Sequence, residues 1–68
     1  MSDQLLVKLR IARETKGWTQ AELAARMGVS RKTVNTVENG VFVPSTVVAL
    51  KAAEAIGCRV EDLFALAT

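Results

Sequence analysis

Apolar side chains recur every three or four positions along most of this 68-residue chain, which is the spacing of helices that bury one face. No stretch shows the strict apolar–polar alternation of a half-buried strand, and neither a repeat nor a linker interrupts the pattern. The pattern predicts one all-α domain over residues 1–68 with five short helices. These span about residues 4–16, 20–27, 31–39, 45–56 and 60–66.

Residues that typically begin or end helices are most evident between positions 19 and 40. Thr19 and Glu22 have the spacing of a capping box, in which each side chain bonds the other residue's backbone N–H. Ser30 suits the cap of the next helix, and Gly28 suits the turn between the two. Two short helices joined by a glycine-containing turn predict a helix-turn-helix with its core over residues 19–40.

The inward positions predict an aliphatic core, because the chain has few aromatic residues. Trp18 is expected to pack between elements, and Cys58 is expected to pack rather than react. Arg59 stands where the fifth helix needs a cap, and arginine cannot accept a hydrogen bond. The residues expected to face inward on the first, fourth and fifth helices are Leu5, Leu9, Ala12, Leu50, Ala53, Ile56, Val60, Leu63 and Phe64.

Composition excludes several classes of function. One cysteine and no histidine leave no internal disulfide and no ligand set for zinc. No apolar run approaches a membrane helix and no secretory signal is visible, so a cytoplasmic protein without membrane association is expected. Neither a catalytic constellation nor a phosphate-binding glycine loop is present, and we therefore expect no enzyme, no cofactor and no small-molecule effector site.

Charge is distributed unevenly although the net value is only +2. Residues 1–39 carry seven basic and four acidic side chains, a balance of +3, whereas residues 40–68 carry two basic and three acidic ones, a balance of −1. One end of the domain is thus more electropositive, which favours an anionic partner only moderately.

The third predicted helix has one polar and one apolar face. At roughly 100° per residue, its polar arc contains no acid, while Val34 and Val37 lie opposite and Thr33 lies at the margin. The arc consists of Arg31, Lys32, Asn35, Thr36 and Asn39. Arginine and lysine suit guanine, asparagine suits adenine and a threonine methyl suits thymine, so the arc favours reading of DNA bases. An ordinary solvated face remains the alternative at this point.

The string TQAELAARMGVSRKTVNTVENG resembles the phage-repressor/Cro family of helix-turn-helix domains, also called the xenobiotic-response-element type. The similarity extends over residues 5–66 and includes the Gly17-Trp18 lead-in, the Pro44-Ser45 cap and the closing Glu61-Asp62-Leu63-Phe64 segment. It implies a five-helix lambda-repressor-like fold that binds double-stranded DNA.

The resemblance also implies roles for particular residues. Gln20 is similar to a glutamine that contacts a phosphate and supports the third helix, while Ser30 and Asn39 match backbone-contacting positions. Arg13 and Glu38 match an ion pair between the first and third helices. The base-reading positions are matched by Arg31, Lys32 and Thr36, with Thr33 and Asn35 as secondary candidates.

We therefore expect a sequence-specific transcription regulator, a small prokaryotic repressor that binds a palindromic operator as a homodimer. The dimer contact is expected in the region of the fourth and fifth helices or in the loop 41–43, which is more apolar than the family's usual loop. The core is expected to be too small to bury every apolar side chain, and those expected to stay outside it are Phe42, Val48 and Leu66. Two alternatives stay open: a protein-interaction module such as an antitoxin or bridging adapter, and the DNA-binding head of a larger effector-sensing regulator.

Overall fold

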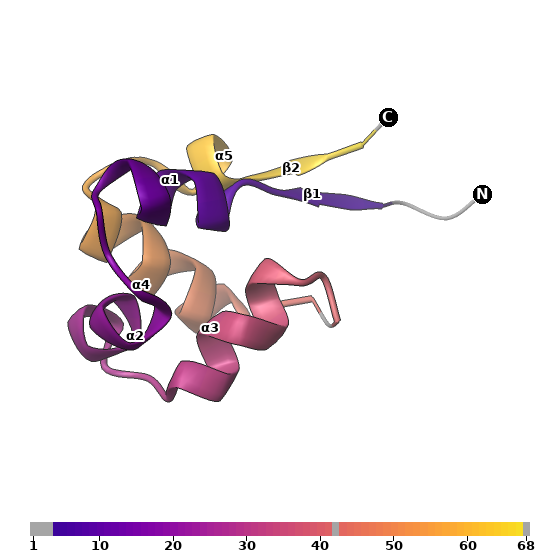
Figure 1. The fold of residues 1–68 in the computed structure, drawn as a ribbon. Coiled ribbons are helices and arrows are strands. Elements are labelled where there is room, and N and C mark those ends of the chain that lie inside the picture. The colour runs from indigo at the N-terminus through magenta and orange to yellow at the C-terminus, as the bar shows by residue number, and fades with distance from the viewer. Residues whose placement is uncertain (1–3, 42, 68) are drawn as a thin grey trace.

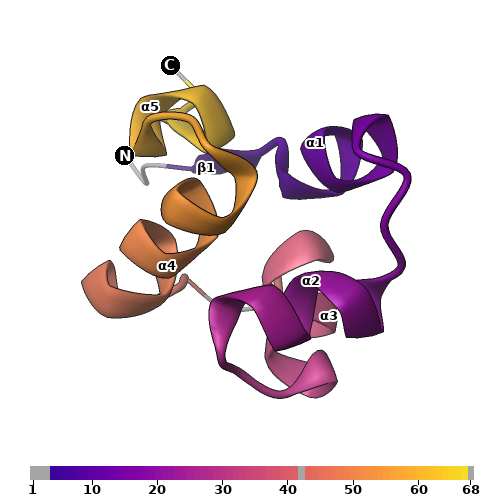
Figure 2. The same cartoon turned by 90° about the vertical axis from the view of Figure 1, so that its left-hand side faces the viewer.

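Five helices and one two-stranded sheet form the computed structural model, which describes residues 4–41 and 43–67 (Figure 1). In chain order the elements are β1 (Leu5–Val7), α1 (Leu9–Thr15), α2 (Gln20–Met27), α3 (Arg31–Glu38), α4 (Thr46–Ile56), α5 (Val60–Leu63) and β2 (Phe64–Leu66). The helices surround one core, with α2 and α3 at one end and α5 at the other (Figures 1 and 2).

The predicted starts and ends of α2, α3 and α4 are confirmed to within one residue. The Oγ of Ser45 accepts a hydrogen bond from the N–H of Val48 at 3.1 Å, which caps α4. At the end of α2, Gly28 has a φ of 72° and the N–H of Val29 donates to the carbonyl oxygen of Ala24 at 3.0 Å. This left-handed turn needs glycine, because a side chain there would be strained.

The two strands correct the prediction of an all-α chain. Residues 4–16 do not form one helix: Leu5–Val7 are extended and pair antiparallel with Phe64–Leu66, and α1 begins only at Leu9. Flanking backbone bonds lengthen the ladder, from Ala67 N–H to the Gln4 carbonyl and from Lys8 N–H to the Leu63 carbonyl, both at 2.8 Å. The sheet was missed because its hydrogen bonds join residues about 60 positions apart, and a three-residue strand has too little alternation to reveal itself.

The fifth helix is shorter than the predicted range 60–66. It ends at Leu63, because Phe64 is extended with φ −134° and ψ 135° and continues directly into β2. At its start, Arg59 contributes no side-chain cap, as predicted, and its N–H instead donates to Oδ2 of Asp62 at 3.1 Å. The paired strands thus set the point at which α5 stops.

The core is aliphatic, as the composition predicts, with one correction on α4. Leu50 is 57% exposed instead of inward-facing, and Ala52 takes the inward position with no exposed surface. Trp18 and Cys58 pack partly against the core, and burial raises the pKa of the Cys58 thiol. The buried residues are Leu9, Leu23, Ala24, Met27, Val34, Val37, Ala52, Ala53, Ile56, Leu63 and Phe64.

Candidate nucleic-acid interface

Both helices of the predicted helix-turn-helix begin with side-chain caps. Thr19 Oγ1 accepts from the Glu22 N–H at 3.1 Å, and Glu22 Oε1 accepts from the Thr19 N–H at 2.9 Å, which completes the capping box. That backbone hydrogen bond is the main reason why the pKa of Glu22 is lowered. Ser30 caps α3 by accepting from the Thr33 N–H at 3.1 Å. The sequence in this region therefore defines where α3 begins and which way it leaves the turn.

The two faces of α3 are as predicted. Val34 and Val37 are 0% and 1% exposed and join the core. On the other side Arg31 and Lys32 are exposed, together with Ser30 and Asn39 at the ends, while Thr33, Asn35 and Thr36 are half-buried. Arg31, Lys32 and Asn35 line one shallow hollow on this surface. The exposed face thus combines two long cations with short neutral hydrogen-bonding groups.

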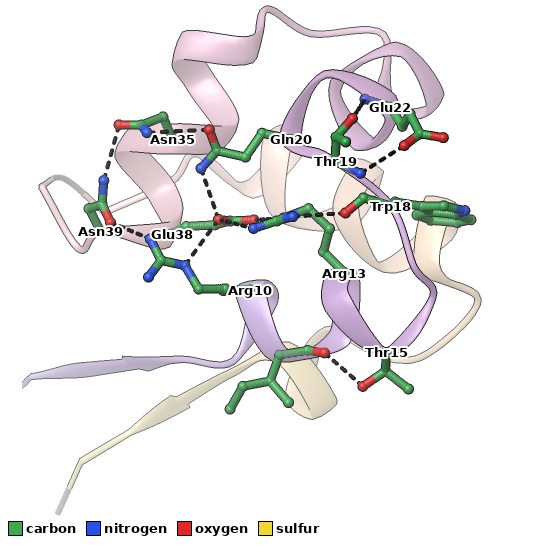
Figure 3. Close-up of polar contacts among 11 residues, drawn as sticks. Arg10, Arg13, Thr15, Trp18, Thr19, Gln20, Glu22, Asn35, Glu38 and Asn39 are labelled. Atoms are coloured by element: carbon green, nitrogen blue, oxygen red, sulfur yellow. Dashed lines mark hydrogen bonds and ion pairs between the residues drawn. The ribbon is translucent and has the colours of Figure 1, made fainter.

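The single acid of α3 is withdrawn from that face. The Glu38 side chain has no exposed surface, and its carboxylate accepts from Arg13 at 2.7 Å (Nε to Oε2) and 3.2 Å (Nη2 to Oε1). This two-pronged contact confirms the ion pair between α1 and α3 that the family resemblance implies. Arg13 also donates to the Trp18 carbonyl at 2.8 Å (Figure 3).

Opposing effects act on the pKa of Glu38. Burial alone raises the pKa of this carboxyl, but hydrogen bonds and charge from Arg13, Gln20 and Arg10 outweigh burial and lower it. The hydrogen bond to Glu38 also raises the pKa of Arg13. Glu38 is consequently ionised at neutral pH but neutralised by its neighbours, and its negative charge does not face an approaching polyanion.

Three amide side chains connect this ion pair to the exposed face of α3. Gln20 Nε2 donates to Glu38 Oε1 at 3.0 Å, and Asn35 Nδ2 donates to Gln20 Oε1 at 3.3 Å (Figure 3). Asn39 Nδ2 in turn donates to Asn35 Oδ1 at 3.0 Å. The expected support of the third helix by Gln20 is therefore present. Each of the three amides keeps a second N–H that these bonds do not use.

The hydroxyl residues of α3 divide into two groups. Thr36 Oγ1 donates to carbonyl oxygens of its own helix, at 3.0 Å from both Lys32 and Thr33, so its one hydroxyl hydrogen is already used. The hydroxyls of Ser30 and Thr33 lie 2.9 Å apart. Whichever donates, the other keeps a free hydroxyl hydrogen, because each group has one donor. A donor is thus available at the N-terminal end of α3.

Sequence reasoning missed Arg10. Its Nη2 donates to Asn39 Oδ1 at 2.8 Å, and its Nε lies 3.5 Å from Glu38 Oε1, which brings α1 into contact with the end of α3 (Figure 3). A signal was present, since Arg10 precedes Arg13 by three positions and such residues share a helix face. Trp18 was predicted only as a packing residue, but the Arg26 guanidinium also lies 4.1 Å from its ring centroid.

Residues 9–63 match the model of the helix-turn-helix family of the Cro/C1 type. The chain belongs to this family. It is 40% identical over 57 residues to an uncharacterised helix-turn-helix transcriptional regulator of Methanocaldococcus jannaschii, a match that covers 84% of this chain and 86% of the relative. An uncharacterised helix-turn-helix transcriptional regulator of Bacillus subtilis is 39% identical over 57 residues. This match also covers 84% of this chain and 86% of the relative.

A solved structure has the same fold as this helix-turn-helix protein. The restriction-modification controller protein of Aeromonas hydrophila is 36% identical, superposes with a TM-score of 0.78, and is matched over 81% of this chain and 83% of that one. Together these relationships show a small DNA-binding transcription regulator and not an enzyme. Among the described residues, no helix is long and apolar enough to span a membrane.

Proposed function

We propose that this protein binds double-stranded DNA sequence-specifically as a two-fold homodimer on a palindromic operator and represses transcription by occluding the promoter in the cytoplasm. The observation that carries the proposal is the charge arrangement of α3. Arg31 and Lys32 are exposed at its beginning, whereas the side chain of Glu38 has no exposed surface and pairs with Arg13. A helix that exposes its cations and buries its acid suits the negatively charged major groove.

The available groups suggest how the work divides along α3. The side chains of Arg31 and Lys32 form no hydrogen bond or ion pair with residues 4–41 and 43–67, so both can reach guanine edges. The methyl of the half-buried Thr36 suits a thymine, and Asn35 lies beside the two cations, where it suits an adenine. Phosphate contacts at the helix ends are assigned to Gln20, Ser30 and Asn39, on the family resemblance and on their unused donors, and Thr33 is kept as a secondary candidate for reading bases.

An apolar groove supports the dimer. It lies between α4, α5 and β1 and is rimmed by exposed apolar side chains, including Leu50 at 57% and Val43 at 74%. We call this surface the α4–α5 groove; its lining is Leu5, Val43, Pro44, Thr46, Ala49, Leu50, Val60 and Phe64. Leu66 is also exposed as expected, Val48 is half-buried, and Phe42 lies outside the described residues.

A second copy is the occupant that DNA recognition requires. One recognition helix reads only about four or five base pairs, too few to define a unique site, whereas two helices about 34–36 Å apart read both halves of a palindrome. Covering the groove with a second copy also removes apolar surface from water. The regulators of M. jannaschii and B. subtilis are each matched over 86% of their length, so those relatives consist largely of this helix-turn-helix domain.

Selection of bound sites from a random duplex library tests the proposal directly. We expect a palindromic preferred sequence and an affinity that falls steeply with salt. Arg31→Ala should weaken the selected site by about 1–3 kcal/mol and random duplex much less. Lys51→Ala, which removes an exposed cation outside the helix-turn-helix, serves as the matched control and should show little selective loss.

The α4–α5 groove also favours a second candidate, a module whose main partner is another protein. In that case the wild-type protein would select no sequence and bind random duplex only weakly, while substitutions in the groove would abolish partner binding. An equal loss on selected and random duplex in Arg31→Ala would instead reduce Arg31 to a phosphate contact.

A further inference from the structure

Arg10 completes a closed ring of side chains at the border between α1 and α3. Starting at Glu38, the ring passes through Gln20, Asn35 and Asn39 to Arg10, which returns to Glu38 (Figure 3). The two bonds that involve Arg10 are 2.8 Å to Asn39 and 3.5 Å to Glu38. Members therefore come from α1, α2 and α3, and the ring connects the bundle to the exposed face of α3.

The two charged members of this ring, Arg10 and Glu38, determine the orientation of the three amide groups between them. Arginine only donates hydrogen bonds and an ionised carboxylate only accepts them. Asn39 must consequently turn its oxygen toward Arg10 and its nitrogen toward Asn35. The same sense continues, because the nitrogen of Asn35 faces Gln20 and the nitrogen of Gln20 faces Glu38. An amide group in the middle of such a chain has no equally bonded flipped state.

Asn35 is the ring member that also borders the candidate base-reading surface. It lines the hollow beside Arg31 and Lys32, and both ends of its amide are held within the ring. Asn39, by contrast, is exposed, and among the residues that the structure describes only Asn35 and Arg10 bond its side chain. Without Arg10, Asn39 would keep a single bond, and its hold on the oxygen of Asn35 would weaken.

We propose that Arg10 is a positioning residue that orients Asn35, through Asn39, for recognition of one base pair. This inference rests on the proposed function. A side chain that is held in its binding orientation before DNA arrives loses less conformational freedom on binding, and its hydrogen bonds then discriminate more strongly between bases. Arg10 itself is half-exposed, with 51% of its side-chain surface accessible, so it can be replaced without opening the core.

The first test uses the free protein. Nitrogen-15 relaxation of the asparagine side-chain amides should show Asn35 and Asn39 ordered in the wild type and more mobile in Arg10→Ala, with a nearly unchanged urea midpoint. Unchanged amide order would overturn the inference, whether or not the protein reads DNA. This readout also separates a failure of the ring from a failure of the proposed function, which would appear as a wild-type protein without any preferred sequence.

The second test compares selected sequences. Arg10→Ala should relax the preference at one base pair of each half-site, the same one that relaxes in Asn35→Ala, and should weaken the selected site about fivefold or more. The double variant should lose no more than the larger single loss, because both changes remove one interaction. Additive losses, different base pairs or an equal loss on all duplexes would overturn the proposal.

Arg10→Lys separates geometry from charge. Lysine keeps the positive charge but lacks the planar fork with which arginine holds Asn39 and Glu38 together. We expect random-duplex affinity and its salt dependence to stay close to wild type while the same base pair is relaxed. Full recovery of the sequence preference with lysine would show that Arg10 contributes only charge, and would overturn the positioning role.

Discussion

Replacing Glu38 with alanine should be among the most destabilising single changes in this domain. The side chain is fully buried and its carboxylate accepts hydrogen bonds from Arg13, Gln20 and Arg10. Removing it leaves the Arg13 guanidinium, only 11% exposed at the side chain, without its counter-ion. The cost therefore arises mainly from the stranded cation and not from the lost attraction itself.

The magnitude follows from these contacts. Breaking a buried ion pair by removing one partner costs about 3–5 kcal/mol. Arg13 keeps a hydrogen bond to the Trp18 carbonyl and some access to solvent, so we expect about 2–4 kcal/mol for Glu38→Ala. A domain of this length is stable by only about 3–10 kcal/mol, and the variant should be close to unfolding at physiological temperature.

Urea denaturation, followed by far-ultraviolet circular dichroism and by the fluorescence of Trp18, measures the loss. Glu54→Ala, which removes an exposed acid from α4, is the matched control and should change the free energy of unfolding by less than about 0.5 kcal/mol. Replacing both Arg13 and Glu38 by alanine should recover about 1–3 kcal/mol of the summed single losses. Strictly additive losses would refute the reasoning, because they would mean that the two side chains do not interact.

Three further outcomes are expected. The pKa of Glu38 is lowered in the fold, so its ionised carboxylate stabilises the folded state fully above about pH 4.3, the ordinary pKa of a glutamate. This stabilisation disappears as the pH falls through the pKa that Glu38 has in the folded protein. Urea midpoints should therefore drop below about pH 4, and Glu38→Gln should flatten that drop; identical profiles would contradict the assignment. Ser30→Asp should preserve the cap of α3 and the stability within about 0.5 kcal/mol, yet weaken binding to every duplex by repelling phosphates, as titrations at two salt concentrations would show. Unchanged DNA affinity would remove Ser30 from the interface. Leu50→Asp should shift sedimentation from dimer to monomer without unfolding the domain, because Leu50 is exposed. A persistent dimer would place the interface elsewhere.

Local sequence was sufficient to predict the helix-turn-helix. Thr19, Glu22 and Ser30 each bond a backbone group three residues away, and Gly28 adopts the left-handed conformation that its own position in the turn requires. Such interactions depend only on neighbours in the chain, so they can be recognised without knowledge of the fold. The polar and apolar faces of α3 follow equally directly from a period of 3.6 residues.

Only the tertiary structure decided which long-range partners these elements meet. The pairing of β1 with β2, and with it the early end of α5 at Leu63, depends on backbone hydrogen bonds across nearly the whole chain. The ring that Arg10 closes has the same origin, since Arg10 and Asn39 are 29 positions apart. A sequence shows the donors and acceptors that a side chain offers, whereas the packing of α1 against α3 determines which of them come within hydrogen-bonding distance.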